Sequence, residues 1–148
     1  YPLEHTLTLL AQYLDQIKPL LKKKLDYTVT YHDSCCLARH NHFYEEPRAL
    51  LRAIPGIKLV EMAHNRMNTI CCGGGGGGMW LDTYYKTKGY ERLSDRRVKE
   101  ALATGADVLA IGCDYEFSRF EDALKVGNGD GRMVVRDIVE LLAESMEG

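Results

Sequence analysis

The sequence predicts an α/β fold with a mostly parallel sheet flanked by helices. Three short segments have the pattern of β-strands, at residues 27–32, 57–62 and 107–112. Segments of helical character separate them, and strands that alternate with helices are typical of a parallel sheet. The chain has 148 residues, of which 45% are hydrophobic and 27% are charged. We therefore expect a single globular domain over residues 1–148.

The first two elements follow from the periodicity of the N-terminal segment. Leucine and isoleucine recur at spacings of three and four between Leu3 and Leu21, as on one face of an amphipathic helix. Pro19 is expected to kink or end this helix, because proline removes a backbone donor. Residues 27–32 then alternate with the period of a strand, which ends just before Asp33.

Proline and glycine punctuate the rest of the chain. Pro47 suits the first turn of a helix over residues 48–54, and Pro55-Gly56 breaks that helix before the second strand. Gly105 is a favourable stop for a later helix. The other expected elements are helices at 79–86, 92–104 and 117–125, the strand at 107–112, a turn at 127–131, a last strand at 132–135 and a closing helix at 137–146.

Charge and composition exclude several classes of protein. The net charge is −2, which gives no sign of a surface for nucleic acid. No apolar segment approaches the roughly 20 residues that span a bilayer, and there is no secretory signal pattern. Five cysteines, with two adjacent pairs among them, make a poor disulfide framework and favour the reducing cytoplasm. Since a helical pattern begins almost at Tyr1, we expect a fragment of a longer subunit.

The cysteines and a glycine run are the most informative motif. Cys71-Cys72 leads directly into six glycines at residues 73–78, while Cys35 follows the first strand and Cys113 follows the third. Sites in open α/β sheets form outside the carboxyl ends of the strands, so these four cysteines are expected to meet there. Glycine lets the backbone approach a bulky group, and helices that begin nearby are expected to lower the thiol pKa values. Four soft thiolates indicate an iron–sulfur cluster.

Other interpretations of this motif stay open. Zinc also suits four thiolates, although structural zinc sites prefer paired C-x-x-C knuckles, and a non-catalytic module with zinc or no metal is the alternative. Cys36 can be a buried hydrophobe, because its side chain is expected to point away from that of Cys35. The glycine run could be a linker or a nucleotide loop, but residues 68–70 are too short for the strand that such a loop requires.

Histidines and arginines accompany the cysteines. His5 is expected at the surface of the first helix, and His40, His42 and His64 lie in loops, where hydrogen bonding or an ordinary loop role is more common than metal ligation. Arg39 and Arg66 flank the same site and could neutralise a cluster or hold an anionic substrate, although a solvated arginine is the default.

These residues resemble a known family. The segments that carry the resemblance are Tyr31-His32-Asp33-Ser34-Cys35, Arg39-His40-Asn41, Pro47-Arg48, Cys71-Cys72-Gly73 with its glycine tail, and Gly112-Cys113. Together they are similar to the cysteine-rich CCG domain, which occurs in heterodisulfide reductase catalytic subunits and in iron–sulfur subunits of glycolate and lactate oxidation systems. The resemblance covers nearly the whole chain.

The resemblance implies an α/β domain that usually occurs twice per polypeptide, of which this chain would be the second. In heterodisulfide reductases the motif binds a noncubane double 4Fe-4S cluster that cleaves disulfides, whereas other members hold a simpler cluster or zinc, or serve only structure. The resemblance implies that the ligands are Cys35, Cys71, Cys72 and Cys113. These four cysteines, together with Glu116, are also the candidate catalytic residues. The carried-over residues beside the cofactor are Gly73, Gly74, Arg39 and His40.

Glu116 is a departure from the family pattern, which ends in C-x-x-C. It stands three residues beyond Cys113 and would face the same side of a helix. Carboxylate is a harder ligand than thiolate, so we expect four thiolates to hold a simpler cluster with Glu116 as a neighbour or weak ligand. The resemblance implies an oxidoreductase domain that reduces a disulfide or passes electrons within a redox complex, including to a quinone-linked carrier. Membrane association would come through other subunits.

Overall fold

The computed structural model describes residues 3–127, 129 and 131–147, and the side chains of residues 84–86 are not among those described. Within this part of the chain, four parallel strands form one sheet in the order β2-β1-β3-β4. The parallel α/β fold predicted from the sequence is confirmed. The strands are β1 (Thr28–Tyr31), β2 (Lys58–Val60), β3 (Val108–Ile111) and β4 (Val134–Asp137).

The register explains which strands carry the core. Val29 of β1 lies opposite Leu59 of β2 on one side and Val108 of β3 on the other, and Leu109 of β3 lies opposite Val135 of β4. The central strand β3 is buried along its whole length, as expected for a strand that is covered on both faces. The edge strand β2 keeps more exposure.

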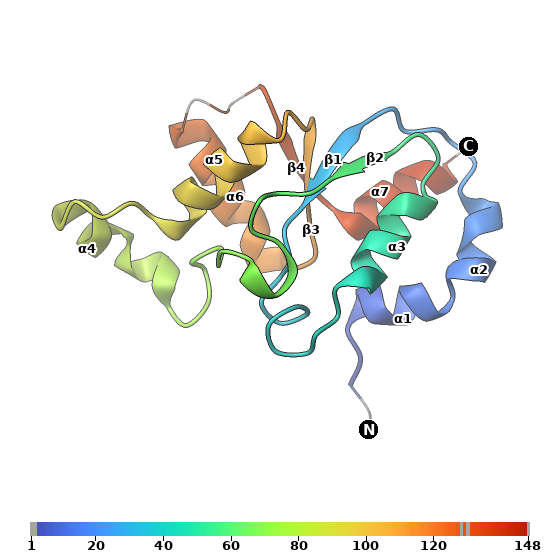
Figure 1. Ribbon diagram of the computed structural model, residues 1–148, viewed down its shortest axis with the longest axis horizontal. Coiled ribbons are helices and arrows are strands. Elements are labelled where there is room, and N and C mark those ends of the chain that lie inside the picture. Colours follow the sequence, from blue (N-terminus) through green and yellow to red (C-terminus); the bar gives the residue numbers. More distant parts are fainter. Residues whose placement is uncertain (1–2, 128, 130, 148) are drawn as a thin grey trace.

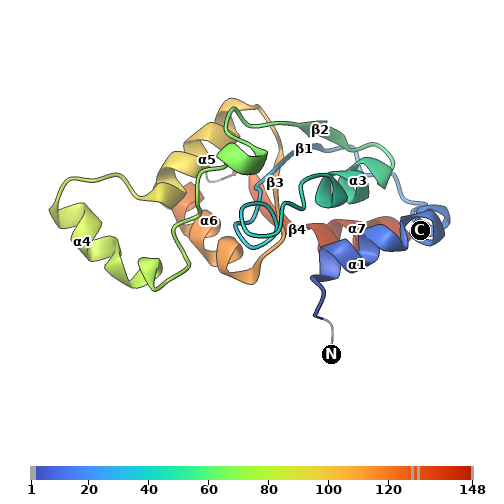
Figure 2. The ribbon, with the colours of Figure 1, turned by 60° about the horizontal axis from the view of Figure 1, so that its bottom comes forward.

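Helices cover both faces of the sheet (Figures 1 and 2). One apolar cluster joins helices α1, α3 and α7 to the sheet, and a second joins α5 and α6 to its other face. The helices are α1 (Thr6–Gln12), α2 (Leu14–Ile17), α3 (Glu45–Ala53), α4 (Asp82–Thr87), α5 (Leu93–Ala103), α6 (Asp114–Val126) and α7 (Ile138–Met146), with single 3₁₀ turns η1 (Lys18–Leu20), η2 (Arg66–Asn68) and η3 (Gly78–Leu81).

Two N-terminal elements differ from the expected bounds. The first helix is interrupted at Tyr13, whose backbone angles lie outside the helical region, so the break precedes Pro19. Leu3 is 98% exposed and contributes nothing to the buried face. Helix α3 begins at Glu45, two residues before Pro47, because acidic residues in a first turn are stabilised by the helix dipole.

The bounds of helix α6 and of the last strand also differ from the expected ranges. Helix α6 begins directly after Cys113, three residues earlier than the expected 117, and carries Asp114 and Glu116 in its first turn. The last strand lies two residues later than the expected 132–135. The expected turn at 127–131 includes residues 128 and 130, which lie outside the described residues. No helix in the described ranges is long and apolar enough to cross a membrane.

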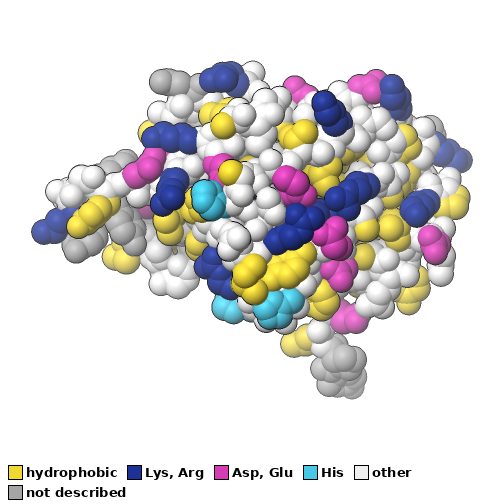
Figure 3. Space-filling view, in the orientation of Figure 1, with side chains coloured by type: hydrophobic (Ala, Val, Ile, Leu, Met, Phe, Trp, Pro, Cys, Tyr) yellow, Lys and Arg dark blue, Asp and Glu magenta, His cyan; other side chains and the backbone are white. Residues whose placement is uncertain are grey.

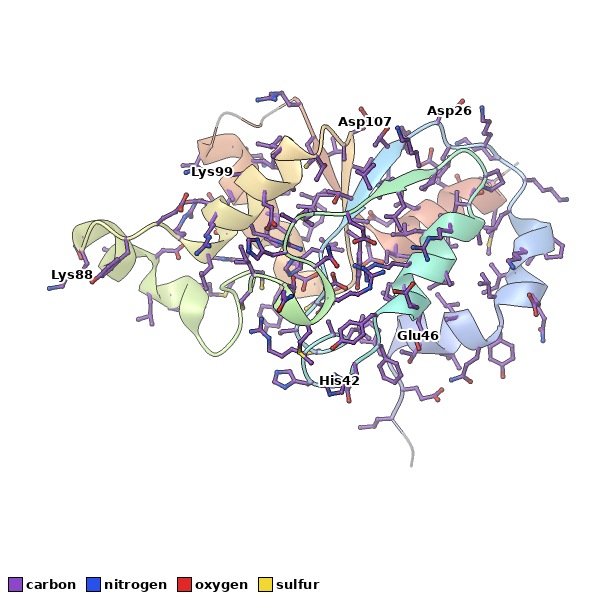
Figure 4. All side chains as sticks on the ribbon, viewed as in Figure 1. Asp26, His42, Glu46, Lys88, Lys99 and Asp107 are labelled. Carbon is purple, nitrogen blue, oxygen red and sulfur yellow. The ribbon has the colours of Figure 1, made fainter. Side chains whose placement is uncertain are left out.

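The two ends of the sheet carry different loops. Asp26 and Asp107 precede β1 and β3, and Figure 4 shows them at one end of the molecule and His42 at the other. At the end that carries His42, the loop after β1 lies beside the segment that follows β2 (Figures 1 and 2). The segment with η3 and α4 projects from the body in both views. The carboxyl edge of the sheet is therefore where loops from different strands meet.

Candidate metal centre

The five cysteines lie in segments that follow β1, β2 and β3 along the chain. Cys35 and Cys36 begin the turn that follows β1, and Cys113 is the N-cap of α6 immediately after β3. Cys71 and Cys72 lie in the loop that follows η2. All five are free thiols.

Electrostatic interactions show that these thiols are neighbours. Cys35 interacts with Cys36 and Cys71, Cys71 interacts with Cys72, and Cys113 interacts with Cys36. Cys35 therefore lies near Cys71, which lies near Cys72, and Cys113 lies near Cys36. Their service as metal ligands stays a prediction.

The glycine run supplies backbone donors to the adjacent cysteine pair. The amide of Gly73 donates to Cys71 Sγ at 3.4 Å, and the amide of Gly74 donates to Cys72 Sγ at 3.4 Å. Gly73 has φ +75°, which L side chains rarely adopt. A Cβ at Gly74 would lie 3.6 Å from Cys72 Sγ and 3.2 Å from Arg119 Cγ. The expected close approach of glycine backbone to the sulfur atoms is therefore present.

The pKa values of Cys71 and Cys72 are shifted in opposite directions. Interaction with Cys72 and the Gly73 amide lowers the pKa of Cys71, against the effect of burial. The interaction with Cys71, followed by burial, raises the pKa of Cys72. Cys71 therefore loses its proton readily, whereas Cys72 retains its proton. A cation bound to both sulfur atoms would stabilise the fully ionised pair.

The pKa of Cys113 is raised, which corrects the expectation that a helix N-terminus lowers it. Burial raises the pKa of Cys113 most, and the charge of Glu116 adds to it. These effects outweigh hydrogen bonds from the amides of Tyr115 and Glu116. Burial and the charge of Cys36 likewise raise the pKa of Cys35.

Glu116 is buried beside Cys72 and His32. It is 1% exposed, its Oε1 lies 3.4 Å from His32 Nε2, and its Oε2 accepts from the Gly112 amide at 3.4 Å. One potential ligand atom from each of His32, Cys72 and Glu116 falls within 4.8 Å of the others. Glu116 faces the thiols, as its helical spacing from Cys113 indicates.

His32 is a residue of the site that the sequence reasoning missed. Its Nδ1 accepts from Arg97 Nε at 2.9 Å, so the ring proton belongs on Nε2, which faces Glu116. The ring packs edge-on against Phe120 with centroids 4.8 Å apart. The available signal was its position at the end of a predicted strand, three residues before Cys35.

A buried ion-pair network holds the loop that carries Cys35. Arg48 is fully buried and donates to both oxygens of Asp33, at 2.7 and 2.8 Å, and to Glu61 at 2.7 Å. Asp33 also accepts from the Arg66 amide at 2.8 Å. Asp33 follows β1 and Arg66 follows β2. The network therefore fastens together the two loops that bear Cys35 and the Cys71-Cys72 pair.

The flanking arginines have separate roles. Arg39 Nη2 donates to the Thr69 carbonyl at 2.6 Å, and its charge contributes to the lowered pKa of Cys71. Arg66 instead donates to Glu45 at 2.6 Å. Arg39 is thus positioned to offset negative charge at the site, whereas the Arg66 guanidinium is engaged by a carboxylate elsewhere.

The other histidines have local partners. His40 is exposed in the turn after β1, and its amide donates to the Cys35 carbonyl at 3.1 Å. His42 pairs with Tyr44 at 3.0 Å, and His64 pairs with Glu100 at 2.9 Å. His5 caps α1, with its ring accepting from the Leu7 amide.

Cys36 differs from its expected placement. The segment after β1 is a helical turn, with Ala38 N donating to Ser34 O at 2.8 Å and Arg39 N donating to Cys35 O at 3.1 Å. The expectation of divergent side chains assumed extended backbone and is wrong here. Cys36 is exposed, so it is also no buried hydrophobe. Its thiol acts on those of Cys35 and Cys113.

The donor set and its surroundings fit an iron–sulfur cluster. Thiols predominate, and backbone amides already point at two of the sulfur atoms. A cavity of about 550 Å³ is lined by Cys36, Cys113, Gly112 and Ser34. The buried Ser34 hydroxyl has no hydrogen-bond partner among the described residues, so it can donate to a bound group. Acidic and basic side chains interleave over the face shown in Figure 3, and neither sign dominates it.

The fold and site define a thiol-rich α/β domain with its cysteines at the carboxyl edge of a parallel sheet. Residues 29–115 match the family of cysteine-rich domains designated CCG. The chain belongs to this family.

Three relatives show the wider context. The chain is 38% identical to the protein named probable iron-sulfur-binding oxidoreductase FadF of Bacillus subtilis, over 97% of this chain and 20% of that protein. It is 37% identical to a subunit of the dihydromethanophenazine:CoB–CoM heterodisulfide reductase of Methanosarcina mazei, over 96% of this chain and 33% of that protein. It is 32% identical to the EtfAB:quinone oxidoreductase of Syntrophomonas wolfei, over 99% of this chain and 21% of that protein. The chain thus spans a fifth to a third of these relatives.

Proposed function

We propose that this chain is the iron–sulfur-cluster domain of a heterodisulfide-reductase-like oxidoreductase. Cys35, Cys71, Cys72 and Cys113 would hold the cluster. The observation that carries the proposal is that thiols from separate loops are neighbours, Cys35 of Cys71 and Cys36 of Cys113, with glycine amides directed at Cys71 and Cys72. The domain would serve in disulfide reduction or in electron transfer to a partner.

A bound cluster would supply one-electron redox chemistry, and the protein residues would tune it. The amides of Gly73 and Gly74 stabilise negative charge on sulfur, which favours the reduced state. Arg39 adds positive charge near Cys71. His32 and Glu116 are buried, and each has a polar atom within 4.8 Å of Cys72 Sγ.

The relatives support a place in a larger redox assembly. Their names describe an iron-sulfur-binding oxidoreductase, a heterodisulfide reductase subunit and a quinone oxidoreductase. By analogy, residues 1–148 would form one domain of a longer subunit. Its partners would be other subunits, with a disulfide or a quinone-linked carrier as the electron acceptor, and association with a membrane would come through those other parts.

A zinc site is the second candidate, and one observation favours it. His32, Cys72 and Glu116 present nitrogen, sulfur and oxygen atoms within 4.8 Å of one another, and zinc accepts all three kinds of ligand. In that case the domain would be a structural module without redox chemistry.

Metal and sulfide analysis of anaerobically purified protein distinguishes the two. We expect iron and acid-labile sulfide in about equal amounts, with an EPR signal on reduction. Cys71→Ser should lose most of the iron, whereas His42→Ala should retain it, because His42 is exposed and pairs with Tyr44. Zinc in place of iron, with no acid-labile sulfide, would overturn the proposal.

A further inference from the structure

We infer that Cys36 is a fifth thiolate ligand of the metal centre, at the side of the site shared with Cys35 and Cys113. This inference rests on the proposed cluster. The position of Cys36 after β1 is fixed by the fold, and its thiol is the most exposed of the five.

The backbone after β1 gives Cys36 the geometry of a ligand. The bonds from Ala38 N to Ser34 O and from Arg39 N to Cys35 O close one turn of helix around Cys35 and Cys36. Adjacent side chains in such a turn are rotated by about 100°, whereas on extended backbone they point to opposite faces. The carboxamide of Asn41 donates to the Cys36 carbonyl at 2.6 Å and holds the turn closed. Both thiols can therefore reach one centre.

Cys36 shares its surroundings with Cys113, which comes from a different element. Both residues line the same cavity of about 550 Å³, together with Gly112 and Ser34. A Cβ at Gly112 would lie 2.7 Å from Leu7 Cδ1, so the leucine side chain would have to shift to admit it. The buried Ser34 hydroxyl lacks a partner among the described residues, so this wall of the cavity has a free donor. A polar or anionic group in the cavity would lie beside both Cys36 and Cys113.

Glu116 is less suited to this position. One of its oxygens accepts from the Gly112 amide, and the other lies 3.4 Å from His32 Nε2. Moving either oxygen onto a metal would leave a buried donor unpaired, which costs free energy. Cys36 is exposed and can bind a metal without breaking a buried contact. Thiolate is also the softer ligand and the better match for iron.

Alkylation under native, anaerobic conditions tests the inference with a readout other than activity. Iodoacetamide is added to cluster-loaded and iron-stripped protein, and modification of each cysteine is followed by peptide mass spectrometry. Cys36, the most exposed thiol, should be alkylated in stripped protein, and at least about tenfold more slowly once ligated. Stoichiometric alkylation of Cys36 in protein that keeps its iron and sulfide would refute the ligand role while leaving the proposed function intact.

Variants distinguish metal ligation by Cys36 from steric protection of Cys36 by a cluster bound nearby. Cys36→Ser should lower the iron content and change the EPR or Mössbauer spectrum, whereas His42→Ala, in the same loop, should change neither. In Glu116→Gln, Cys36 should stay protected from iodoacetamide. An unaltered iron content and spectrum in Cys36→Ser would overturn the inference, as would loss of Cys36 protection in Glu116→Gln. Protein that holds no iron in any form would overturn both proposals.

Discussion

At the scale of single residues, a buried charge pair holds the loop that carries Cys35. Arg48 and Asp33 have fully buried side chains and form two hydrogen bonds to each other. Hydrogen bonds that Arg48 donates to Asp33 and Glu61 raise the pKa of Arg48 against the effect of burial, so the guanidinium stays charged. Removing one partner would leave a buried charge uncompensated.

We expect Asp33→Asn to lower the free energy of unfolding by about 3 kcal/mol, because Arg48 loses its buried counter-charge. Glu45→Gln is the matched control, since the side chain of Glu45 is 59% exposed and its ion pairs are expected to contribute less than about 1 kcal/mol. Urea unfolding, followed by circular dichroism, measures both. Equal losses in the two variants would show that burial of the Arg48–Asp33 pair is unimportant.

At the scale of elements, the glycine run acts through a few defined positions. Gly73 has φ +75°, and a Cβ there would lie 3.2 Å from Leu93 Cβ on α5. Gly75 has ordinary φ, and a Cβ would meet nothing within 4 Å. A side chain should therefore be strained at Gly73 and tolerated at Gly75.

Gly73→Val should empty the metal centre while the helices persist, because a β-branched residue is strained at positive φ and would displace the amide that donates to Cys71. Gly75→Val places the same side chain in open space and should keep the iron. Iron per protein and far-UV circular dichroism are measured on both variants. Full occupancy in Gly73→Val would contradict the role assigned to this glycine.

At the scale of the whole molecule, an ion pair fastens the projecting segment to the body. Asp82 begins α4 and pairs with Arg119 of α6 at 2.7 Å, and Arg92 joins it at 3.2 Å. Arg119 in turn lies against Gly73 and Gly74. The segment that extends from the sheet in Figures 1 and 2 is thus connected to the loop that carries Cys71 and Cys72.

This connection should depend on pH. Hydrogen bonds from Arg119 lower the pKa of Asp82, against burial. The stabilisation is therefore fully present above the ordinary aspartate pKa of about 3.9, and it disappears as the pH falls through the lower folded value. Asp82→Asn should reduce the free energy of unfolding by about 1 kcal/mol at pH 7, and by progressively less below about pH 4.

Denaturant unfolding of wild type and Asp82→Asn, at a series of pH values from 7 to 3, measures this difference. Glu91→Gln is the control on the same segment, because Glu91 pairs with the exposed Lys99 and should contribute little. A difference between wild type and Asp82→Asn that does not change with pH would rule out the charged pair as its origin.

Much of the fold could be predicted because it depends on local pattern. Strand and helix periodicities gave the parallel α/β class, and most elements differ from expectation by only a few residues at their ends. The bounds were less predictable: neither Tyr13, where the first helix breaks, nor Cys113, which precedes α6, makes a side-chain capping hydrogen bond. Local composition leaves such end points undetermined.

The sequence by itself placed Cys35 and Cys113 after two strands of one parallel sheet, and parallel strands deliver the loops that follow them to one edge. Only the tertiary structure decided what surrounds them. The Arg97–His32 contact joins residues 65 positions apart, and Glu116 reaches His32 from a third element. The placement of Cys36 depended on whether one loop was extended or helical. Such contacts arise from packing between distant segments, which sequence spacing does not encode, whereas strand direction follows from chain connectivity alone.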